Sequence, residues 1–224
     1  MTRSYRSDLR FVVALVALML FARAGILRAA EPVRFSEHLL AENLGYVFGV
    51  AAADLDGDGD LDLTSPDIRN KSHSTLFWYQ NDGQGSFKRL VIYKDEPGWF
   101  ERHAVGDLNG DGTLDLAIVN NLNGHVIWFA NSGKPAAGLW RKFVISTDCP
   151  KAYGVTLADF DRDGDLDAAT SGYVSHLVTW YENPGTDGLD KEWDRHGIDN
   201  KMHESRTIDA GDFNRDGHAS GQCA

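Results

Sequence analysis

The stretch ADLDGDGDLDL, residues 53–63, places five aspartates at alternate positions of a nine-residue run. At neutral pH the carboxylates of such a run repel one another. A folded chain tolerates the crowding when a cation lies among them. The run therefore predicts a bound metal ion.

The same pattern recurs three times further along the chain, at GDLNGDGTLDL (106–116), ADFDRDGDLDA (158–168) and, in part, GDFNRDG (211–217). The four loops begin 53, 52 and 53 residues apart, at Asp54, Asp107, Asp159 and Asp212. A fixed period of this length indicates a repeat architecture.

Each repeat contains the same order of short β segments. An apolar segment leads into the aspartate loop, and a second segment with small and branched residues follows it. An aromatic segment such as STLFWYQN (74–81), a Gly-rich turn and a segment such as FKRLVIY (87–93) complete the unit. Four strands joined by Gly, Asn and Asp turns match one blade of a β-propeller. We predict an all-β chain of four-stranded antiparallel blades with minimal helix.

The predicted blades span about residues 46–93, 103–146 and 152–199, and an incomplete fourth covers 206–224. The last unit ends in HASGQCA, with no further strand expected, so the ring is predicted to be open or incomplete. Propellers close with about 4 to 8 blades. The alternatives are a truncated or frameshifted chain of a longer protein, a nonfunctional gene fragment, and an arc that closes by self-association through its open blade faces.

Residues 33–40 resemble a fourth strand of a blade. The pattern Phe35-x-x-His38-x-Leu40 matches Trp193-x-x-His196-x-Ile198. An orphan outer strand at the N-terminus would complete the last blade of a closed ring. A plain β segment with a chance match is the alternative.

The N-terminus, residues 1–30, has a basic start, an apolar core of about ten residues and small residues at plausible cleavage points, as in a secretory signal peptide. The apolar run is too short for a membrane span. The chain has two cysteines, Cys149 and Cys223, which either pair or remain free thiols. The predicted location is outside the cytoplasm: secreted, periplasmic or at the cell surface, with no membrane span after cleavage.

The chain of 224 residues has a formal net charge of -11, with 33 acidic and 22 basic side chains. Such a balance argues against nucleic acid as a partner. Many of the carboxylates lie in the four repeated loops, where bound dications would offset their charge.

The ligand spacing in the loops favours Ca²⁺, which takes about 6 to 8 oxygen ligands in flexible geometry. Side-chain oxygens fall at loop positions 1, 3, 5 and 9, a carbonyl falls at position 7, and Gly stands at position 6. Zn²⁺ would want His or Cys. The predicted ligands are Asp54, Asp56, Asp58, Asp60 (carbonyl) and Asp62; Asp107, Asn109, Asp111, Thr113 (carbonyl) and Asp115; Asp159, Asp161, Asp163, Asp165 (carbonyl) and Asp167; and, in an incomplete fourth site, Asp212, Asn214 and Asp216.

An EF-hand would begin in the same way but needs a bidentate Glu at position 12. The residues there are Ser65, Ile118 and Thr170. A second strand follows each loop at once, so the calcium is expected to be structural. The second loop has one carboxylate fewer and should bind more weakly.

The units FGVAAADLDGDGDLDL, AVGDLNGDGTLDLAI and GVTLADFDRDGDLDAAT resemble FG-GAP or VCBS-type repeats of bacterial secreted proteins, which are related in form to the integrin α-subunit propeller. The resemblance covers nearly the whole chain after the predicted signal peptide. It implies a propeller with calcium in the loop between the first two strands of each blade. It does not imply one function, because the fold serves adhesion modules, carbohydrate binders and enzymes.

A ligand is expected on the face opposite the calcium loops. The residues predicted there are Arg102, His103, Lys151, Tyr153, His203, Glu204 and Arg206, with Asn120, Asn121 and Asn123 in a neighbouring connection. Ordinary solvated loops are the alternative. The expected partner is a carbohydrate or a cell-surface protein.

No nucleophile and base can be paired from the sequence, and no phosphate loop is visible, so the sequence favours a non-catalytic binding or adhesion module. The alternative is the propeller part of a carbohydrate-active enzyme. The run WYENPG followed by WDRHGI resembles blades of aldos-2-ulose dehydratase-like proteins, and polysaccharide lyases also use calcium-rich propellers.

Overall fold

The computed structural model describes residues 34–69 and 72–223. The chain divides into two units, residues 1–38 and 39–224. The predicted signal peptide lies outside the described residues and stays a prediction. Among the residues that are described, no helix is long and apolar enough to cross a membrane.

Residues 34–40 form no strand, and the side chain of Phe35 is 92% exposed. The predicted orphan strand at 33–40 is therefore wrong for the part of it that the structure describes. A strand persists only when a neighbour satisfies its backbone N–H and C=O groups. The residue pattern indicated how side chains would alternate, but it could not supply a neighbouring strand.

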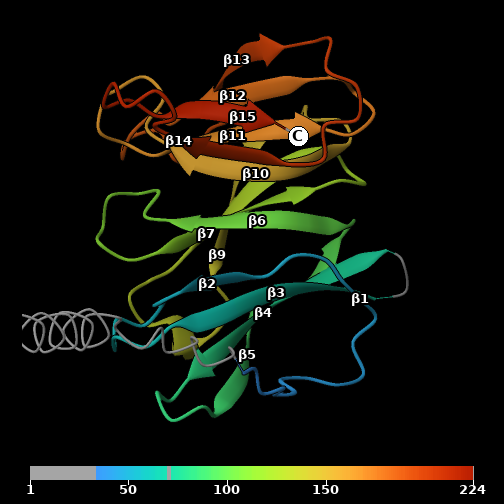
Figure 1. Cartoon of the computed structure of the whole chain (residues 1–224), viewed down its shortest axis with the longest axis vertical. Helices are drawn as coiled ribbons and strands as arrows, with labels where there is room; N and C mark the ends of the chain where they lie inside the picture. Colours follow the sequence, from blue (N-terminus) through green and yellow to red (C-terminus); the bar gives the residue numbers. More distant parts are fainter. Residues whose placement is uncertain (1–33, 70–71, 224) are drawn as a thin grey trace, which may run out of the picture. The chain divides into compact units, whose positions relative to one another are not determined.

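Four antiparallel sheets follow one another along residues 46–223 (Figure 1). The strands of the first are β1 (Tyr46–Val47), β2 (Ala51–Ala53), β3 (Asp62–Arg69), β4 (His73–Asn81) and β5 (Phe87–Pro97). Those of the second are β6 (Phe100–Gly106), β7 (Asp115–Asn120), β8 (His125–Ala130) and β9 (Arg141–Ser146). The third contains β10 (Ala152–Ala158), β11 (Asp167–Gly172), β12 (Val178–Glu182) and β13 (Asp194–Asp199), and the fourth β14 (Ile208–Gly211) and β15 (Ser220–Cys223).

The sheets have a common topology. The second runs β6-β7-β8-β9 and the third β10-β11-β12-β13, so each strand pairs with the next along the chain. In the first sheet the leading strand is broken into β1 and β2, which both pair with β3. The one helical turn among the described residues is the 3-10 segment Pro135–Ala137. The all-β prediction is confirmed.

The prediction that no strand follows the fourth loop is wrong. β15 pairs with β14, from Ile208 opposite Cys223 to Gly211 opposite Ser220. A hairpin needs backbone hydrogen bonds and a turn, so it forms here without the Leu-Asp step of the other repeats. The described sheets form no closed barrel, and their arrangement as a propeller stays a prediction.

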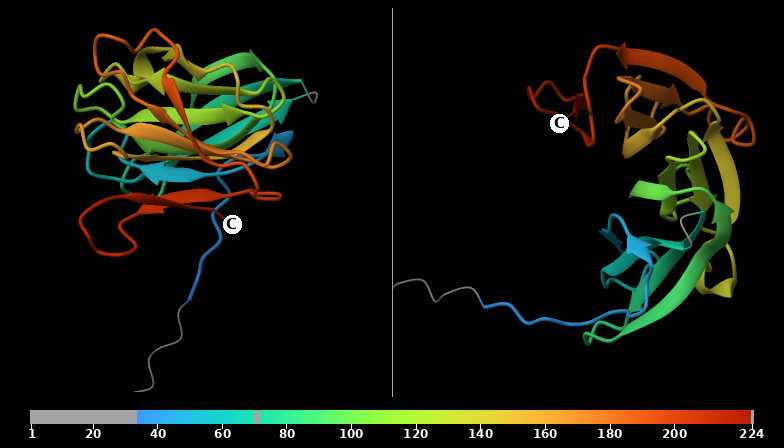
Figure 2. Two further views of the ribbon diagram at one scale, coloured as in Figure 1. Left: turned by 90° about the horizontal axis from the view of Figure 1, so that it is seen from above. Right: turned by 90° about the vertical axis from the view of Figure 1, so that its right-hand side faces the viewer.

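The first strands of consecutive sheets lie side by side, β2 by β6, β6 by β10 and β10 by β14 (Figure 1; Figure 2). The core lies between the sheets. In β7, Leu116 and Ile118 pack in the cluster shared with the first sheet, and Ala117 and Val119 pack in the cluster shared with the third. All four side chains are fully buried. A strand buried on both faces reads as the continuous apolar run LAIV rather than as alternation.

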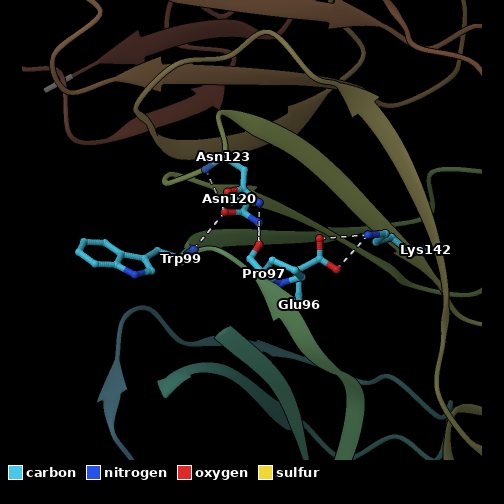
Figure 3. Close-up of polar contacts among 6 residues, drawn as sticks. All are labelled: Glu96, Pro97, Trp99, Asn120, Asn123 and Lys142. Atoms are coloured by element: carbon cyan, nitrogen blue, oxygen red, sulfur yellow. Dashed lines mark hydrogen bonds and ion pairs between the residues drawn. The ribbon is translucent and has the colours of Figure 1, made fainter. Parts of the chain in front are cut away.

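Polar contacts join the first sheet to the second where the chain passes between them (Figure 3). The Lys142 ammonium lies 2.9 Å and 3.0 Å from the two carboxylate oxygens of Glu96. Asn120 Oδ1 accepts the Trp99 N–H at 3.0 Å, and Asn120 Nδ2 donates to the Pro97 carbonyl at 2.8 Å. Asn123 donates to the same carbonyl at 2.7 Å.

Asn121 has a similar structural role, because its Nδ2 donates to the Ala152 carbonyl of the third sheet at 2.9 Å. The structure therefore uses the three asparagines that the sequence suggested for a ligand face to hold backbone. Side-chain amides such as these satisfy backbone groups that no strand pairs.

A second set of asparagines stands at the end of the third strand of each complete sheet or directly after it. Asn131 Nδ2 donates to the Leu55 carbonyl in the loop of the preceding sheet at 2.9 Å. Asn183 Nδ2 repeats the contact with the Leu108 carbonyl at 2.9 Å. Asn81 has no preceding loop and donates to Leu61 of its own loop at 3.0 Å. The first and second aspartate loops are thereby bonded to the sheet that follows each of them.

We predict that Asn131→Ala destabilises the fold by roughly 2–3 kcal/mol, because the carbonyls of Leu55 and Leu114 lose their hydrogen-bond donor. Asn131 is 1% exposed. The matched control is Asn81→Ala, whose amide bonds only within its own sheet and should cost about 1 kcal/mol or less. Urea unfolding at constant calcium measures both. Equal losses in the two variants would contradict a role for Asn131 between the sheets.

Candidate functional site

The four aspartate loops share one backbone conformation, set by the carboxylate at position 1. Asp54 accepts the N–H groups of Gly57, Asp58 and Gly59 at 2.8, 3.1 and 2.9 Å. Asp107, Asp159 and Asp212 each accept the N–H of the glycine at position 6, at 2.8, 3.2 and 2.9 Å. Such bonds turn the loop back on its first aspartate.

The glycine at position 6 is required by the backbone. Its φ is 95° in Gly59, 85° in Gly112, 101° in Gly164 and 87° in Gly217. A side chain is strained at these angles. The turn brings the side chains of positions 1, 3 and 5 to one side of the loop in the first repeat, where carboxylate oxygens of Asp54, Asp56 and Asp58 lie within 4.8 Å of one another.

The third loop also gathers carboxylates, and here position 9 takes part. Oxygens of Asp159, Asp161 and Asp167 lie within 4.8 Å of one another. In the second loop Asp111 instead accepts hydrogen bonds from Asn109 Nδ2 at 3.0 Å and from the Thr113 N–H at 2.8 Å. The structure therefore brings together predicted ligands most closely in the first and third loops.

The donor set fits a hard dication. One observation apart from the clustering supports the fit: Asp56 Oδ1 is buried and has no hydrogen-bond partner among the described residues. A buried carboxylate oxygen without a donor is costly unless a cation or water approaches it. The side-chain atoms that could bind a metal in the loops are all oxygens, which suits Ca²⁺ or Mg²⁺ rather than Zn²⁺.

The aspartate at position 9 is fully buried and ties three segments together. Asp62 accepts the Leu55 N–H at 3.1 Å and the Asn81 N–H at 2.7 Å. Asp115 and Asp167 repeat both bonds with Leu108 and Asn131, and with Phe160 and Asn183, at 2.8 to 3.1 Å. Position 9 thus joins the loop to the end of the third strand.

Burial sets the proton affinity of these aspartates. It raises the pKa of Asp115 to about 7 and of Asp167 to about 6, although the N–H donors act in the opposite direction. Burial also raises the pKa of Asp62. A dication bound beside these carboxylates would favour their ionised form.

The fourth loop keeps the fold of the second without an acid at position 9. Asn214 Nδ2 donates to Asp216 at 2.8 Å, and Asp216 accepts the His218 N–H at 2.9 Å. Ser220, at position 9, donates to the Gly211 carbonyl at 3.3 Å. The loop is formed, and its incompleteness as a metal site stays a prediction.

No role was predicted from the sequence for the asparagines that bond to the aspartate at position 9. The signal was present, because the aromatic strands end in the same Asn-x-Gly order: NDG, NSG and NPG. The glycines of these turns have φ of 68°, 70° and 69°. The Asn Oδ1 accepts the glycine N–H in each, at 3.0 to 3.1 Å.

The predicted ligand face is partly assembled. The Arg102 guanidinium lies over the rings of Phe48 and Tyr153, with 5.1 Å and 5.3 Å from Cζ to the ring centroids. Arg102 Nη1 donates to the Arg206 carbonyl at 2.6 Å. The Arg206 guanidinium lies 4.4 Å from the centroid of Tyr173 and donates to its hydroxyl at 3.0 Å. We use the name Arg-Tyr cluster for these residues together with Glu101: Phe48, Glu101, Arg102, Tyr153, Tyr173 and Arg206.

Four other predicted ligand residues lie apart from this cluster. His103 Nε2 is 2.7 Å from Thr64 Oγ1, and burial lowers the pKa of the imidazole to about 4. The His203 ring packs against His176 at 4.5 Å. Lys151 and Glu204 are exposed, and no side-chain contact joins them to the cluster in the described part of the chain. Arg102 and His103 lie within β6.

Glu101 is the buried acid of the cluster. It is 5% exposed, and its Oε2 has no hydrogen-bond partner among the described residues. Burial raises the pKa of its carboxyl to about 7, while the charge of Arg102 acts against that shift. Glu101 also raises the pKa of Tyr153, after the larger effect of burial.

Of the two cysteines, the structure describes the side chain of Cys149. Cys149 is a buried free thiol, 3.3 Å from Thr170 Oγ1. Burial raises its pKa. The free-thiol alternative therefore holds for Cys149.

The repeats match the model of a known family. A model described as FG-GAP-like repeat matches residues 68–118 and 107–170. The chain is an FG-GAP-type repeat protein. No curated protein matches it significantly.

Solved structures resemble the chain in part. One is the crystal structure of the V. cholerae biofilm matrix protein Bap1, with 17% sequence identity and a TM-score of 0.38. The match covers 80% of this chain and 28% of the Bap1 chain. The chain thus corresponds to a little over a quarter of that structure's length.

We predict that Glu101→Gln stabilises the fold increasingly as pH rises. The folded-state pKa of about 7 exceeds the usual 4.5, so the stability associated with the protonated carboxyl is complete below pH 4.5 and is lost as pH rises through 7. Relative to wild type, the variant should gain roughly 1–3 kcal/mol above pH 7. Urea unfolding across this range at saturating calcium measures the difference. A difference that does not vary with pH would contradict the burial argument.

Proposed function

We propose that this chain is a calcium-stabilised, non-catalytic binding or adhesion module that works outside the cytoplasm. The observation that carries the proposal is the repetition of one acidic loop with oxygen ligands at the same place in consecutive sheets. The first two of these loops are also bonded to the following sheet. The FG-GAP-like repeat match supports the same class of module. Millimolar extracellular calcium suits sites of modest affinity.

The residues that would hold calcium are those of positions 1, 3, 5, 7 and 9 in the first three loops. When bound, the ion supplies positive charge among carboxylates that otherwise repel. The chain's own contribution is the preformed turn, in which backbone N–H groups already orient Asp54, Asp107 and Asp159. The role of calcium is therefore structural, and it holds the first and second strands of each sheet together.

We predict that calcium raises the melting temperature and that a chelator lowers it. A ligand that binds only the folded state at about 100 times its Kd adds about 2.7 kcal/mol per site. Calorimetric titration of the chelated chain should detect up to three sites, with the second loop the weakest. Asp163→Asn should weaken one site about tenfold or more, whereas the exposed Asp190→Asn, outside the loops, should change none.

A chain that melts at the same temperature with and without chelator, and that takes up no calcium, would refute the proposal. A separate experiment, co-sedimentation, tests the proposed binding role. The calcium-loaded chain should co-sediment with an insoluble polysaccharide or a cell-surface protein without converting it.

A carbohydrate-active enzyme is the second candidate, and Glu101 favours it. A buried carboxyl with pKa of about 7 beside an arginine can act as a general acid near neutral pH. His103 does not share this property, since its imidazole is bonded to Thr64. Polyuronate depolymerisation that is lost in Glu101→Gln and retained in His103→Ala would establish the enzyme; no turnover by the wild type would exclude it for this substrate.

A further inference from the structure

Four of the six residues of the Arg-Tyr cluster come from one position of the repeat. Six residues before the first aspartate of the four loops stand Phe48, Glu101, Tyr153 and Arg206. The positions that form the loops keep the same residue types from repeat to repeat, but this position has a different side chain in every repeat. The fold therefore does not require a particular residue here.

The backbone is irregular at that position in each complete sheet. β1 and β2 are separated at residues 48–50. The register between β6 and β7 shifts between Phe100 and His103, and that between β10 and β11 shifts between Ala152 and Gly154. Bulges of this kind re-aim side chains and are common beside binding sites. The two register shifts and the break between β1 and β2 fall at one repeat position and direct side chains of three sheets to one place.

The side chains of the cluster contact one another across the sheets. The Phe48 and Tyr153 rings meet edge to face at 5.4 Å, and Tyr153 lies 5.7 Å from Tyr173. Arg102 bonds the segment before β14 through the Arg206 carbonyl. Residues from all four sheets or their connections thus form one surface, with aromatic rings beneath two guanidinium groups.

The charges in the cluster are unbalanced. Neither Arg102 nor Arg206 forms an ion pair with a carboxylate of the described residues, in a chain with a net charge of -11. Within the described part of the chain, Arg102 donates one hydrogen bond to the Arg206 carbonyl and Arg206 donates one to the Tyr173 hydroxyl, whereas a guanidinium has five N–H donors. Two such groups held on aromatic rings are suited to a carboxylate, which they can bind in bidentate geometry.

We infer that the Arg-Tyr cluster binds a sugar acid, with the ligand carboxylate on Arg102 and Arg206 and ligand hydroxyls on Glu101 and the tyrosine hydroxyls. This assignment rests on the proposed function and names its ligand class. The buried, unpartnered Oε2 of Glu101 needs a donor, which a sugar hydroxyl provides. A glutamate peptide would bring a carboxylate and N–H donors but no hydroxyl, which can both donate and accept, so the cluster favours a uronate.

The test is calorimetric titration of the full, calcium-loaded chain with trigalacturonate at slightly acidic pH. Two comparison ligands are neutral trigalactose and a triglutamate peptide. Arg102→Gln and Arg206→Gln should each weaken trigalacturonate binding about tenfold or more, since each removes charge-assisted hydrogen bonds. The matched control is Arg141→Gln, because Arg141 also lies over a ring, 4.5 Å from the Phe143 centroid, but away from the cluster.

Loss of binding in both cluster variants, with retention in Arg141→Gln and weak binding of both comparison ligands, supports the assignment. No binding by the wild type, or unchanged binding in both variants, overturns it. Equal affinity for triglutamate overturns the sugar part and leaves a carboxylate site. Melting with and without calcium in the same samples reports on the proposed function separately, and it shows whether each variant folds. Should Arg102→Gln not fold, the exposed Arg206 supplies the decisive variant.

Discussion

The buried aspartate at position 9 of each complete loop is the contact on which the rest of the structure depends. Its two oxygens accept one N–H from the loop and one from the end of the third strand, so three segments of a sheet meet at one carboxylate. The neighbouring asparagine then bonds to the loop of the preceding sheet. Sheets with apolar faces could slide over one another, because apolar packing is not directional. These directional bonds fix their register.

The sequence predicted those features that repeat. The period, the strands and the acidic loops followed from spacing, because each loop needs an acid at position 1 and glycine at position 6 for its backbone. The Asn-x-Gly turns were visible as a pattern, but their function was not. The amide of Asn131 acts between sheets, on a carbonyl 76 residues away, and local spacing carries no information on such contacts.

The Arg-Tyr cluster could not be predicted from the sequence, and the reason is a different one. The Arg-Tyr cluster depends on bulges in β6 and β10 and on the break between β1 and β2, and no residue pattern marked them. The burial of Glu101 was not predicted, because an acid in a β segment ordinarily faces solvent. Its burial arises only when the second sheet packs against the first. Conversely, His103 looked available and is held by Thr64 of the first sheet. Contacts between repeats decided each case.

The acidic loops and the Arg-Tyr cluster lie at opposite ends of the same strands. Six residues separate Glu101 from Asp107 in the chain, which corresponds to about 20 Å of extended strand. The cluster draws its side chains from consecutive sheets, so it exists only while those sheets keep their register. Ions bound at one end would therefore preorganise guanidinium groups at the other without touching the ligand. In such a design the affinity for a ligand follows the rigidity of the repeats, and the ligand in turn favours the calcium-loaded state by the same free energy.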